Sequence, residues 1–156
     1  MTRVLLTGAN CTLARRFAAA APDAWTVVGT VRDGATAPVD TTRMDLRERE
    51  SVVETVSRTA PDVIVHVAAC TDVDLCEREP ELARAVNDEG TAAVAAGARR
   101  TGARVVYVST PYVFDGTDGP DDERAVPSPI NVYGRTKRAG ECHVRSLSDA
   151  VTVRFG

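Results

Sequence analysis

Two residues suited to proton transfer, Tyr133 and Lys137, lie four positions apart in the segment NVYGRTKRAGE. This spacing places both side chains on one face of a helix. A free tyrosine has a pKa of about 10, and a neighbouring ammonium favours the phenolate, which makes the phenol a more usable proton donor near neutrality. Thr110 ends an apolar run and carries a hydroxyl that can bond a reacting carbonyl oxygen. We predict a catalytic trio of Thr110, Tyr133 and Lys137, although this tyrosine–lysine spacing also occurs on ordinary helix surfaces.

The segment TGANCTLARR, residues 7–16, follows the apolar run VLL and has features of a phosphate-binding turn. A turn between a strand and a helix presents free N–H groups and a helix dipole to an anion. Gly8 suits the turn, but the two later positions of a G-x-x-G-x-x-G fingerprint hold Cys11 and Ala14. The segment therefore also fits a plain strand-to-helix turn, or a turn with a reactive thiol at Cys11. If it binds a dinucleotide, the site is formed by Gly8, Asn10, Cys11, Thr12 and Leu13.

The end of the second apolar run, GTVRD, bears on which dinucleotide is bound. An acidic residue there favours NADH, whereas Arg32 suits the 2′-phosphate of NADPH. We predict NADPH, with NADH possible, and note that Arg32 also fits a solvated surface charge. Asp45 and Leu46 are predicted to contact the adenine. Asp45 also fits a helix cap, because Glu48 completes a capping-box spacing.

The segments that position these residues alternate between two hydrophobic patterns, one typical of strands and one typical of helices. Short β-branched runs predict strands at 3–7, 25–31, 62–68, 104–109 and 150–155, with a weaker one at 43–45. Helical patterns lie between them, at 12–21, 46–60, about 80–102 and about 133–147. Apolar strands separated by helices predict an α/β fold with a doubly wound parallel sheet of the Rossmann, NAD(P)-binding type. We expect one such domain over residues 1–156, whose last strand either lies at the sheet edge or ends a fragment.

One long segment, residues 111–129, is rich in Pro, Gly and Asp and breaks this regularity. Loops of more than about 12–15 residues in a compact domain are usually functional or disordered. Because this one follows the end of a strand, where doubly wound sheets bind ligands, we predict a flap over the substrate.

Composition restricts the partners. The net charge of −3, without a basic run, argues against nucleic acid, and no apolar stretch reaches the roughly 20 residues of a membrane span. The start, MTRVLL, carries no signal-peptide pattern. The four cysteines form no C-x-x-C pair, so we expect reduced thiols, no metal site and a cytoplasmic location.

Longer motifs resemble one family. The segment 61–90 carries Ala-Ala, Thr-x-Val-Asp, Glu-Pro and Val-Asn landmarks, and VSTPYVFDG and SPINVYGRTKRAGE follow it. Together these segments resemble the extended short-chain dehydrogenase/reductases, in particular the dTDP-4-dehydrorhamnose reductases. The resemblance runs through most of the chain.

The resemblance implies a role for each matching residue. Tyr133 would donate the proton, Lys137 would tune it and hold the nicotinamide ribose, and Thr110 would orient the keto group. Ala68, Ala69 and Ser109 would lie along the cofactor, and Asn87 would brace the sheet near the site, unless it is a helix-surface amide. Thr71, Val73 and Asp74 would flank the entrance.

The implied reaction is the NADPH-dependent reduction of a 4-keto-6-deoxy sugar nucleotide, with a homodimer possible. Cys11 and Ala14 depart from the family's glycines, and Pro111 replaces its aspartate. Members are about twice this long, and their sugar-binding segments come after the position of Gly156. Two alternatives remain open: a non-catalytic binding module like the regulatory subunits of methionine adenosyltransferase, and a sugar-nucleotide epimerase or dehydratase.

Overall fold

A six-stranded parallel sheet forms the centre of the molecule, in a computed structural model that describes residues 1–117, 122 and 124–155. The strand order is β3-β2-β1-β4-β5-β6, and every neighbouring pair is parallel. The strands are β1 (Thr2–Thr7), β2 (Trp25–Val31), β3 (Thr41–Arg43), β4 (Val63–His66), β5 (Arg104–Ser109) and β6 (Ala150–Arg154). This order confirms the predicted doubly wound sheet, in which the chain reverses direction across the sheet between β1 and β4.

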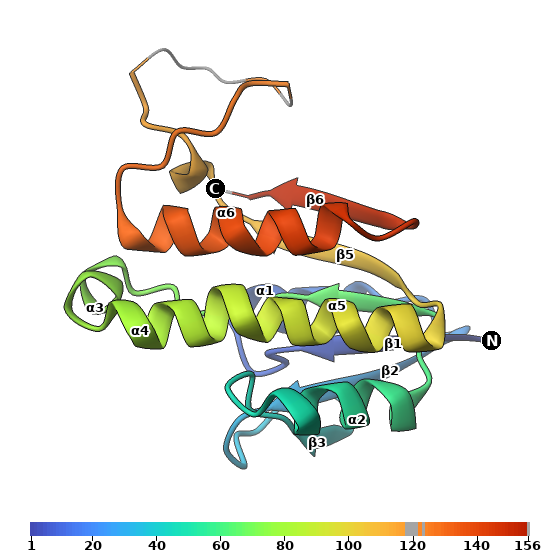
Figure 1. Ribbon diagram of the computed structural model, residues 1–156. Helices are drawn as coiled ribbons and strands as arrows, with labels where there is room; N and C mark the ends of the chain where they lie inside the picture. Colours follow the sequence, from blue (N-terminus) through green and yellow to red (C-terminus); the bar gives the residue numbers. More distant parts are fainter. Residues whose placement is uncertain (118–121, 123, 156) are drawn as a thin grey trace.

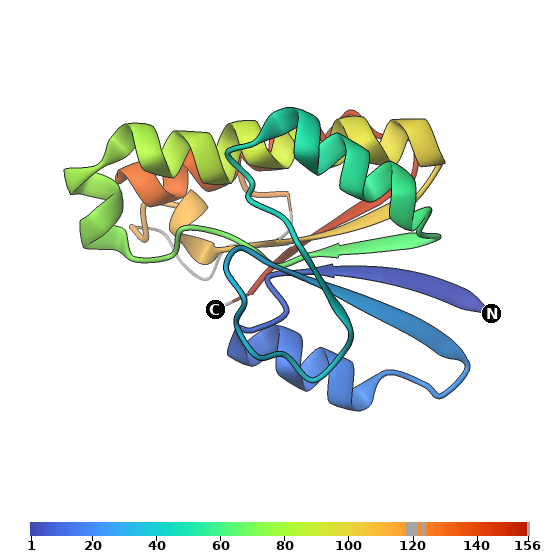
Figure 2. The same ribbon diagram turned by 90° about the horizontal axis from the view of Figure 1, so that it is seen from below.

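Helices cover the two faces of the sheet unequally. One face carries α2 (Arg49–Thr59), α5 (Gly90–Thr101) and α6 (Val132–Arg145), which lie side by side in Figure 1. The other face carries α1 (Thr12–Ala20), seen below the sheet in Figure 2. Short elements precede α5: α3 (Val73–Arg78), α4 (Pro80–Ala83) and a π-helical turn, Arg84–Glu89.

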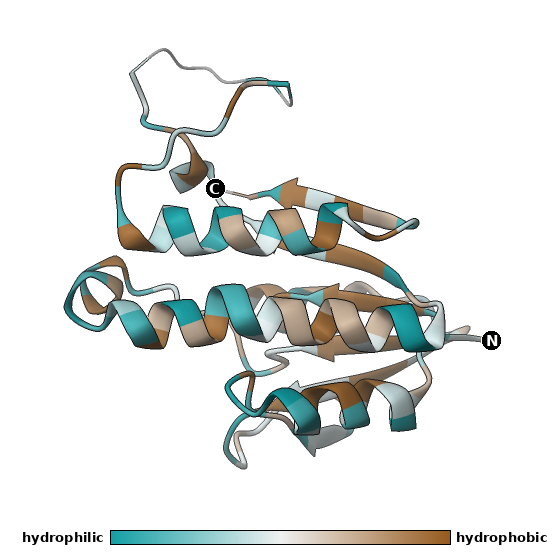
Figure 3. Cartoon of the chain, in the orientation of Figure 1, coloured by the Kyte–Doolittle hydropathy of each residue, from teal (hydrophilic) through white to brown (hydrophobic). Residues whose placement is uncertain are grey.

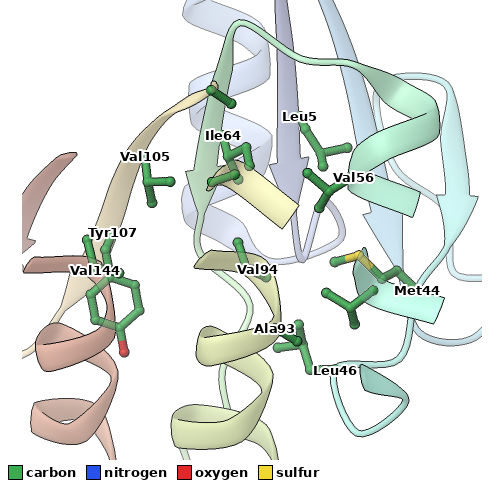
Figure 4. Packing of buried hydrophobic residues seen from close by; sticks show 13 residues of the cluster. Leu5, Met44, Leu46, Val56, Ile64, Ala93, Val94, Val105, Tyr107 and Val144 are labelled. Carbon is green, nitrogen blue, oxygen red and sulfur yellow. The ribbon is translucent and has the colours of Figure 1, made fainter. Parts of the chain in front are cut away.

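The larger core lies between the sheet and the three-helix face. Its members, shown in Figure 4, include Leu5 and Ile64 from the strands and Val56 and Val94 from the helices, all nearly free of solvent contact. Burying each such side chain contributes about 1.5–3 kcal/mol. The brown stripes of α2 and α5 in Figure 3 follow from helical periodicity, because each helix turns an apolar stripe toward the core.

The structure differs from the sequence prediction in four elements. The third strand is Thr41–Arg43 rather than 43–45. The predicted capping box is wrong, because α2 begins at Arg49 and Asp45 instead accepts hydrogen bonds from Arg47. The predicted helix at 80–102 is helical throughout but changes to π register at 84–89, and α3 was not predicted.

The last strand, β6, lies at the edge of the described sheet. Val151 and Val153 are half exposed beside Val106 and Val108 of β5, on the sheet face that carries α1.

The segment predicted as a flap begins with a 3₁₀ turn, Pro111–Val113, and is tied by Ser128 Oγ donating to Asp115 Oδ2 at 2.8 Å. Residues 118–121 and 123 of that flap lie outside the described residues. In the described part of the chain, no helix is long and apolar enough to cross a membrane.

Candidate active site

A cavity of about 590 Å³ opens at the carboxyl ends of β1, β2, β4 and β5. Every residue that the sequence analysis assigns to the cofactor lines it: Gly8, Asn10, Cys11, Thr12, Leu13, Arg32, Asp45, Leu46, Ala68, Ala69, Ser109, Tyr133 and Lys137. Thr110 is buried next to this lining rather than part of it. The fold therefore brings two distant sequence regions, the first turn and α6, to opposite ends of one cavity.

The turn at the first end depends on Gly8. Its φ of +68° lies in the left-handed region, and a Cβ there would meet the Ala68 backbone at 3.0–3.1 Å. Cys11 forms the N-cap of α1, where its Sγ accepts a hydrogen bond from Ala14 N–H at 3.4 Å. Because a helix leaves its first N–H groups without an intrahelical acceptor, those of Thr12 and Leu13 can bind an anion. The turn thus fits a dinucleotide phosphate, with the Cys11 thiol occupied as a cap.

Charged side chains surround the same end of the cavity beyond β2 and β3. Arg32 Nε donates to Asp33 Oδ2 at 2.8 Å, and the Arg32 side chain is 66% exposed. Asp45 is buried and accepts from Arg47 N–H at 3.0 Å and from Arg47 Nε at 2.9 Å. The Arg47 guanidinium lowers the pKa of Asp45 to about 2, against the desolvation that raises it. Two arginines, Arg32 and Arg47, therefore line the end of the cavity that would receive the adenosine.

A buried polar chain connects this turn to the middle of the sheet. Thr7 Oγ1 accepts from the N–H groups of Val67 and Ala68, both at 3.0 Å, so its own proton goes to His66 Nδ1 at 2.8 Å. His66 Nε2 then carries the ring proton and donates to Thr91 Oγ1 at 3.1 Å. Burial lowers the pKa of His66 to about 3, with Lys137 adding to the shift, so the ring is neutral. This chain fixes the turn against the end of β4.

Tyr133 and Thr110 lie together at the other end of the cavity. Thr110 caps the 3₁₀ turn by accepting from Tyr112 N–H at 3.2 Å, and the Tyr112 ring packs edge-on to Tyr133 at 5.7 Å between centroids. The turn lies directly against α6, since a Cβ on Gly134 would collide with the Tyr112 carbonyl oxygen. A glycine at 134 is therefore required for Tyr133 to reach Thr110.

The protonation behaviour of Tyr133 differs from the sequence prediction. Burial raises its pKa, and a hydrogen bond with Thr110 opposes that shift only in part. Lys137 Nζ donates to the Val108 carbonyl at 2.8 Å and lies 4.2 Å from the Tyr107 ring centroid, so its charge is directed at these groups. The pKa of Tyr133 is thus raised rather than brought toward neutrality as predicted, and burial of the phenol is the main cause.

Lys137 itself is 2% exposed, and burial lowers its pKa to about 7. Glu141, one turn along α6, opposes this shift. The Glu141 carboxylate is equally buried and accepts from Ser109 Oγ at 2.7 Å, from Arg138 at 3.1 Å and from Arg154 at 2.9 Å through two nitrogens. These partners lower its pKa against the desolvation that raises it. Glu141 thus connects α6 to both β5 and β6.

Asn87 sits inside the π-helical turn and is buried rather than a surface amide. Its Oδ1 accepts from Cys70 N–H at 2.8 Å, while Nδ2 donates to the Cys70 carbonyl at 3.0 Å and to Thr136 Oγ1 at 3.1 Å. The side chain therefore joins the loop after β4 to α6.

Sequence reasoning missed several residues of the cavity. Arg47 and Met44 line it next to Asp45, and Val86, Val108 and Phe155 line it elsewhere. The signal for Arg47 was a basic residue shortly after the end of a strand, and the buried Glu141 closes the motif SPINVYGRTKRAGE, to which no role was assigned at that position. Among the described residues, no group of three or more His, Cys, Asp or Glu side chains is placed to hold a metal ion.

This sheet order, a glycine turn after β1, and a tyrosine and lysine one helical turn apart in the same cavity define an NAD(P)-binding Rossmann fold of the short-chain dehydrogenase/reductase class. The sequence model of one family in that class, described as the RmlD substrate binding domain, matches residues 1–156. The chain belongs to this family.

Individual relatives and structures agree with this assignment. The dTDP-4-dehydrorhamnose reductase of Salmonella typhimurium is 52% identical over 98 residues, which are 62% of this chain and 33% of that protein. Methionine adenosyltransferase 2 subunit beta of Xenopus laevis is 36% identical over 155 residues, which are 97% of this chain and 45% of that protein. The crystal structure of dTDP-4-dehydrorhamnose reductase from Bacillus anthracis in complex with NADP has a TM-score of 0.84 and 33% identity, covering 98% of this chain and 52% of that one. The chain spans a third to a half of the lengths of these proteins.

Proposed function

We propose that the chain is the cofactor-binding and catalytic part of an NADPH-dependent reductase that acts on a 4-keto-6-deoxy sugar nucleotide. The observation that carries this proposal is the cavity itself, which joins the Gly8 turn to Tyr133 and Lys137 across the carboxyl edge of the sheet, with Thr110 buried beside its lining. When bound, NADPH supplies the hydride. The similar Bacillus anthracis structure, which contains NADP, supports a nicotinamide cofactor.

In this proposal each residue of the trio has a separate task. Tyr133 keeps its proton at neutral pH because burial raises its pKa, and a protonated phenol is what a carbonyl reduction needs. Thr110 caps the 3₁₀ turn whose Tyr112 ring packs on Tyr133, and its hydroxyl is expected to orient the same carbonyl oxygen that Tyr133 protonates. Lys137, whose Nζ donates to the Val108 carbonyl and which lines the same cavity, is expected to bind the nicotinamide ribose hydroxyls.

The preference for NADPH rests on Arg32. A 2′-phosphate adds a charge that the Arg32 guanidinium can bind, because its pair with Asp33 is exposed to solvent, whereas Arg47 is held by the buried Asp45. We expect Arg32→Ala to weaken NADPH binding about tenfold and to leave NADH binding nearly unchanged, as measured by calorimetric titration. Equal losses of affinity for NADPH and NADH would show that Arg32 does not bind the 2′-phosphate.

Turnover in the full-length protein tests the reaction. With a dTDP-4-keto-6-deoxyhexose, we expect stoichiometric loss of NADPH absorbance, and Tyr133→Phe should lower kcat about 10²- to 10⁴-fold. Tyr112→Phe is a matched control, because that ring contacts Tyr133 and its hydroxyl can be removed without changing the ring. Conversion of a sugar nucleotide without net NADPH loss would instead indicate an epimerase or dehydratase.

A second function, a non-catalytic binding module, is favoured by one observation. The match to methionine adenosyltransferase 2 subunit beta covers 97% of the chain, whereas the match to the Salmonella reductase covers 62%. Cofactor binding without turnover on any 4-keto sugar nucleotide, together with a stable complex with a methionine adenosyltransferase catalytic subunit, would support it.

The proposal of a reductase also includes a cytoplasmic location and a homodimer formed through α5 and α6.

A further inference from the structure

Two cysteine side chains face each other beneath Tyr133. Cys70, in the loop after β4, and Cys76, in α3, have their Sγ atoms 3.7 Å apart, and the Cys76 thiol also donates to the Cys70 carbonyl at 3.6 Å. Both thiols are free. The other two cysteines, Cys11 and Cys142, are exposed on α1 and α6.

Separate hydrogen bonds hold each member of this pair. The Cys70 backbone is fixed on both sides by the Asn87 amide, through its N–H and its carbonyl. Cys76 lies in α3, where Asp72 caps the helix and its carbonyl accepts from Cys76 N–H at 2.9 Å. A disulfide requires the sulfur atoms to come to about 2.05 Å, roughly 1.6 Å closer than they lie. Little chain entropy is therefore lost in joining them.

We propose that Cys70 and Cys76 form a reversible dithiol–disulfide site that reacts with low-molecular-weight disulfides such as oxidised glutathione. Cys70 loses its proton and its sulfur attacks the small disulfide, so that a Cys70–glutathione disulfide forms as the glutathione S–S bond breaks, and the departing glutathione thiolate takes up a proton. Cys76 then attacks Cys70 Sγ, and its proton leaves with the second glutathione. In balance, two protein thiols are oxidised to one disulfide and one oxidised glutathione is reduced to two thiols.

The two thiols are suited to different steps. Cys70 is partly exposed, whereas Cys76 has no solvent contact. Burial also raises the pKa of Cys76 to about 12, so this thiol does not react with an external disulfide. Its position against Cys70 makes it a resolving thiol that reacts only after Cys70 has been modified.

The site lies against the candidate active site. Cys76 and Ala83 pack with Tyr133 in one small cluster, and Cys70 packs against its edge. A bond between the two sulfurs would tie α3 to the loop after β4 directly beneath the Tyr133 ring. The formation of the disulfide does not depend on the proposed reductase function.

Peptide mapping of the wild-type chain tests this proposal. Trypsin releases residues 59–78 as one peptide that contains Cys70 and Cys76 and neither of the other cysteines. After equilibration in buffers of rising oxidised-to-reduced glutathione ratio and rapid alkylation, we expect this peptide to lose two hydrogens and to take up no alkyl group. The oxidised fraction should follow the ratio and return to the dithiol form with dithiothreitol.

Two single variants separate the steps. Cys76→Ser should leave a stable glutathione adduct on Cys70, and Cys70→Ser should leave the buried Cys76 unmodified in the folded chain. The proposal is overturned if wild-type peptide 59–78 stays doubly alkylated, or accumulates a glutathione adduct, at ratios that oxidise the urea-unfolded chain. Because the wild-type measurement decides this, the proposal stays testable even if a variant fails to fold.

Discussion

The two ends of the cavity are built in different ways. The end at the β1–α1 turn consists of backbone N–H groups and exposed side chains, including Cys11 and the Arg32 guanidinium. The end at α6 consists of buried polar side chains, with Lys137 and Glu141 each 2% exposed. A backbone site depends on conformation, whereas a buried polar site depends on every partner being present.

This difference explains where the sequence departs from its relatives' motifs. Cys11 stands where a glycine is expected, yet it serves as a helix cap and leaves the conformation of Gly8 intact. The α6 end keeps its tyrosine, lysine and glutamate, because each has partners on other elements. Four substitutions test this contrast, and their expected effects on stability decrease from Glu141 to Cys11.

Glu141→Ala should give the largest loss, because it leaves Arg154 and Arg138 facing a buried site without their carboxylate. We expect the free energy of unfolding to fall by about 3–5 kcal/mol, measured by urea denaturation. Glu48→Ala is the matched control, since its pair with Arg43 is exposed and its removal should change little. Equal small effects for the two variants would show that the α6 end does not depend on the buried pair.

Lys137→Met should change how stability depends on pH. The pKa of Lys137 is about 7 in the folded chain and 10.5 for an unburied lysine, so between these pH values the unfolded chain binds the extra proton. The free energy of unfolding of the wild-type chain should therefore gain roughly 5 kcal/mol from this group as pH rises through that range. In the variant this gain is absent. Parallel pH profiles for the two proteins would contradict the burial of the charge.

Gly8→Ala tests the backbone end. Its positive φ costs an alanine about 1–2 kcal/mol, and the new Cβ also meets the Ala68 backbone. Gly102→Ala is a close control, because Gly102 has a φ of +74° and nothing within 4 Å of its Cβ position. We expect a larger fall in melting temperature at Gly8 than at Gly102, and the reverse order would mean that contact with Ala68 does not constrain the turn.

Cys11→Ser should have the smallest effect on stability. Serine is a preferred N-cap, so the free energy of unfolding should stay the same or rise by less than about 1 kcal/mol. Cys11→Gly should instead tighten NADPH binding, because it removes a side chain from the phosphate turn. A loss of several degrees in melting temperature for Cys11→Ser would mean that the sulfur does more than cap α1.

The sequence was sufficient for the order of strands and helices and for the two motifs at the ends of the cavity, but not for every residue of its lining. β-branched runs and helical periodicity predict β2 and β5 with the bounds observed, and the Gly8 and Tyr133–Lys137 motifs fall at the two ends of the cavity. Both kinds of signal are local, so they can be seen without knowing which elements pack together.

The remaining features depend on contacts between residues that periodicity alone does not bring together. Asp45 has the sequence spacing of a helix N-cap, but its carboxylate accepts hydrogen bonds from Arg47 instead. Asn87 lies in a π-helical turn where periodicity predicts an α-helix. Tyr133 is buried against Cys76, which raises its pKa, and Glu141 is stabilised by Arg154 from the last strand. The contacts of Tyr133 and Glu141 join residues from different elements, so they can be known only once the packing of those elements is known.

The central claim is that one dinucleotide spans both ends of the cavity, with the nicotinamide near Tyr133. The most direct measurement is a titration of the isotope-labelled chain with NADPH, followed by two-dimensional amide NMR. We predict saturable shifts, with one dissociation constant, for the amides of residues 8–13 and for those of Ala68, Ser109 and Lys137. Shifts limited to the surface around Arg32, or none at all, would contradict the account.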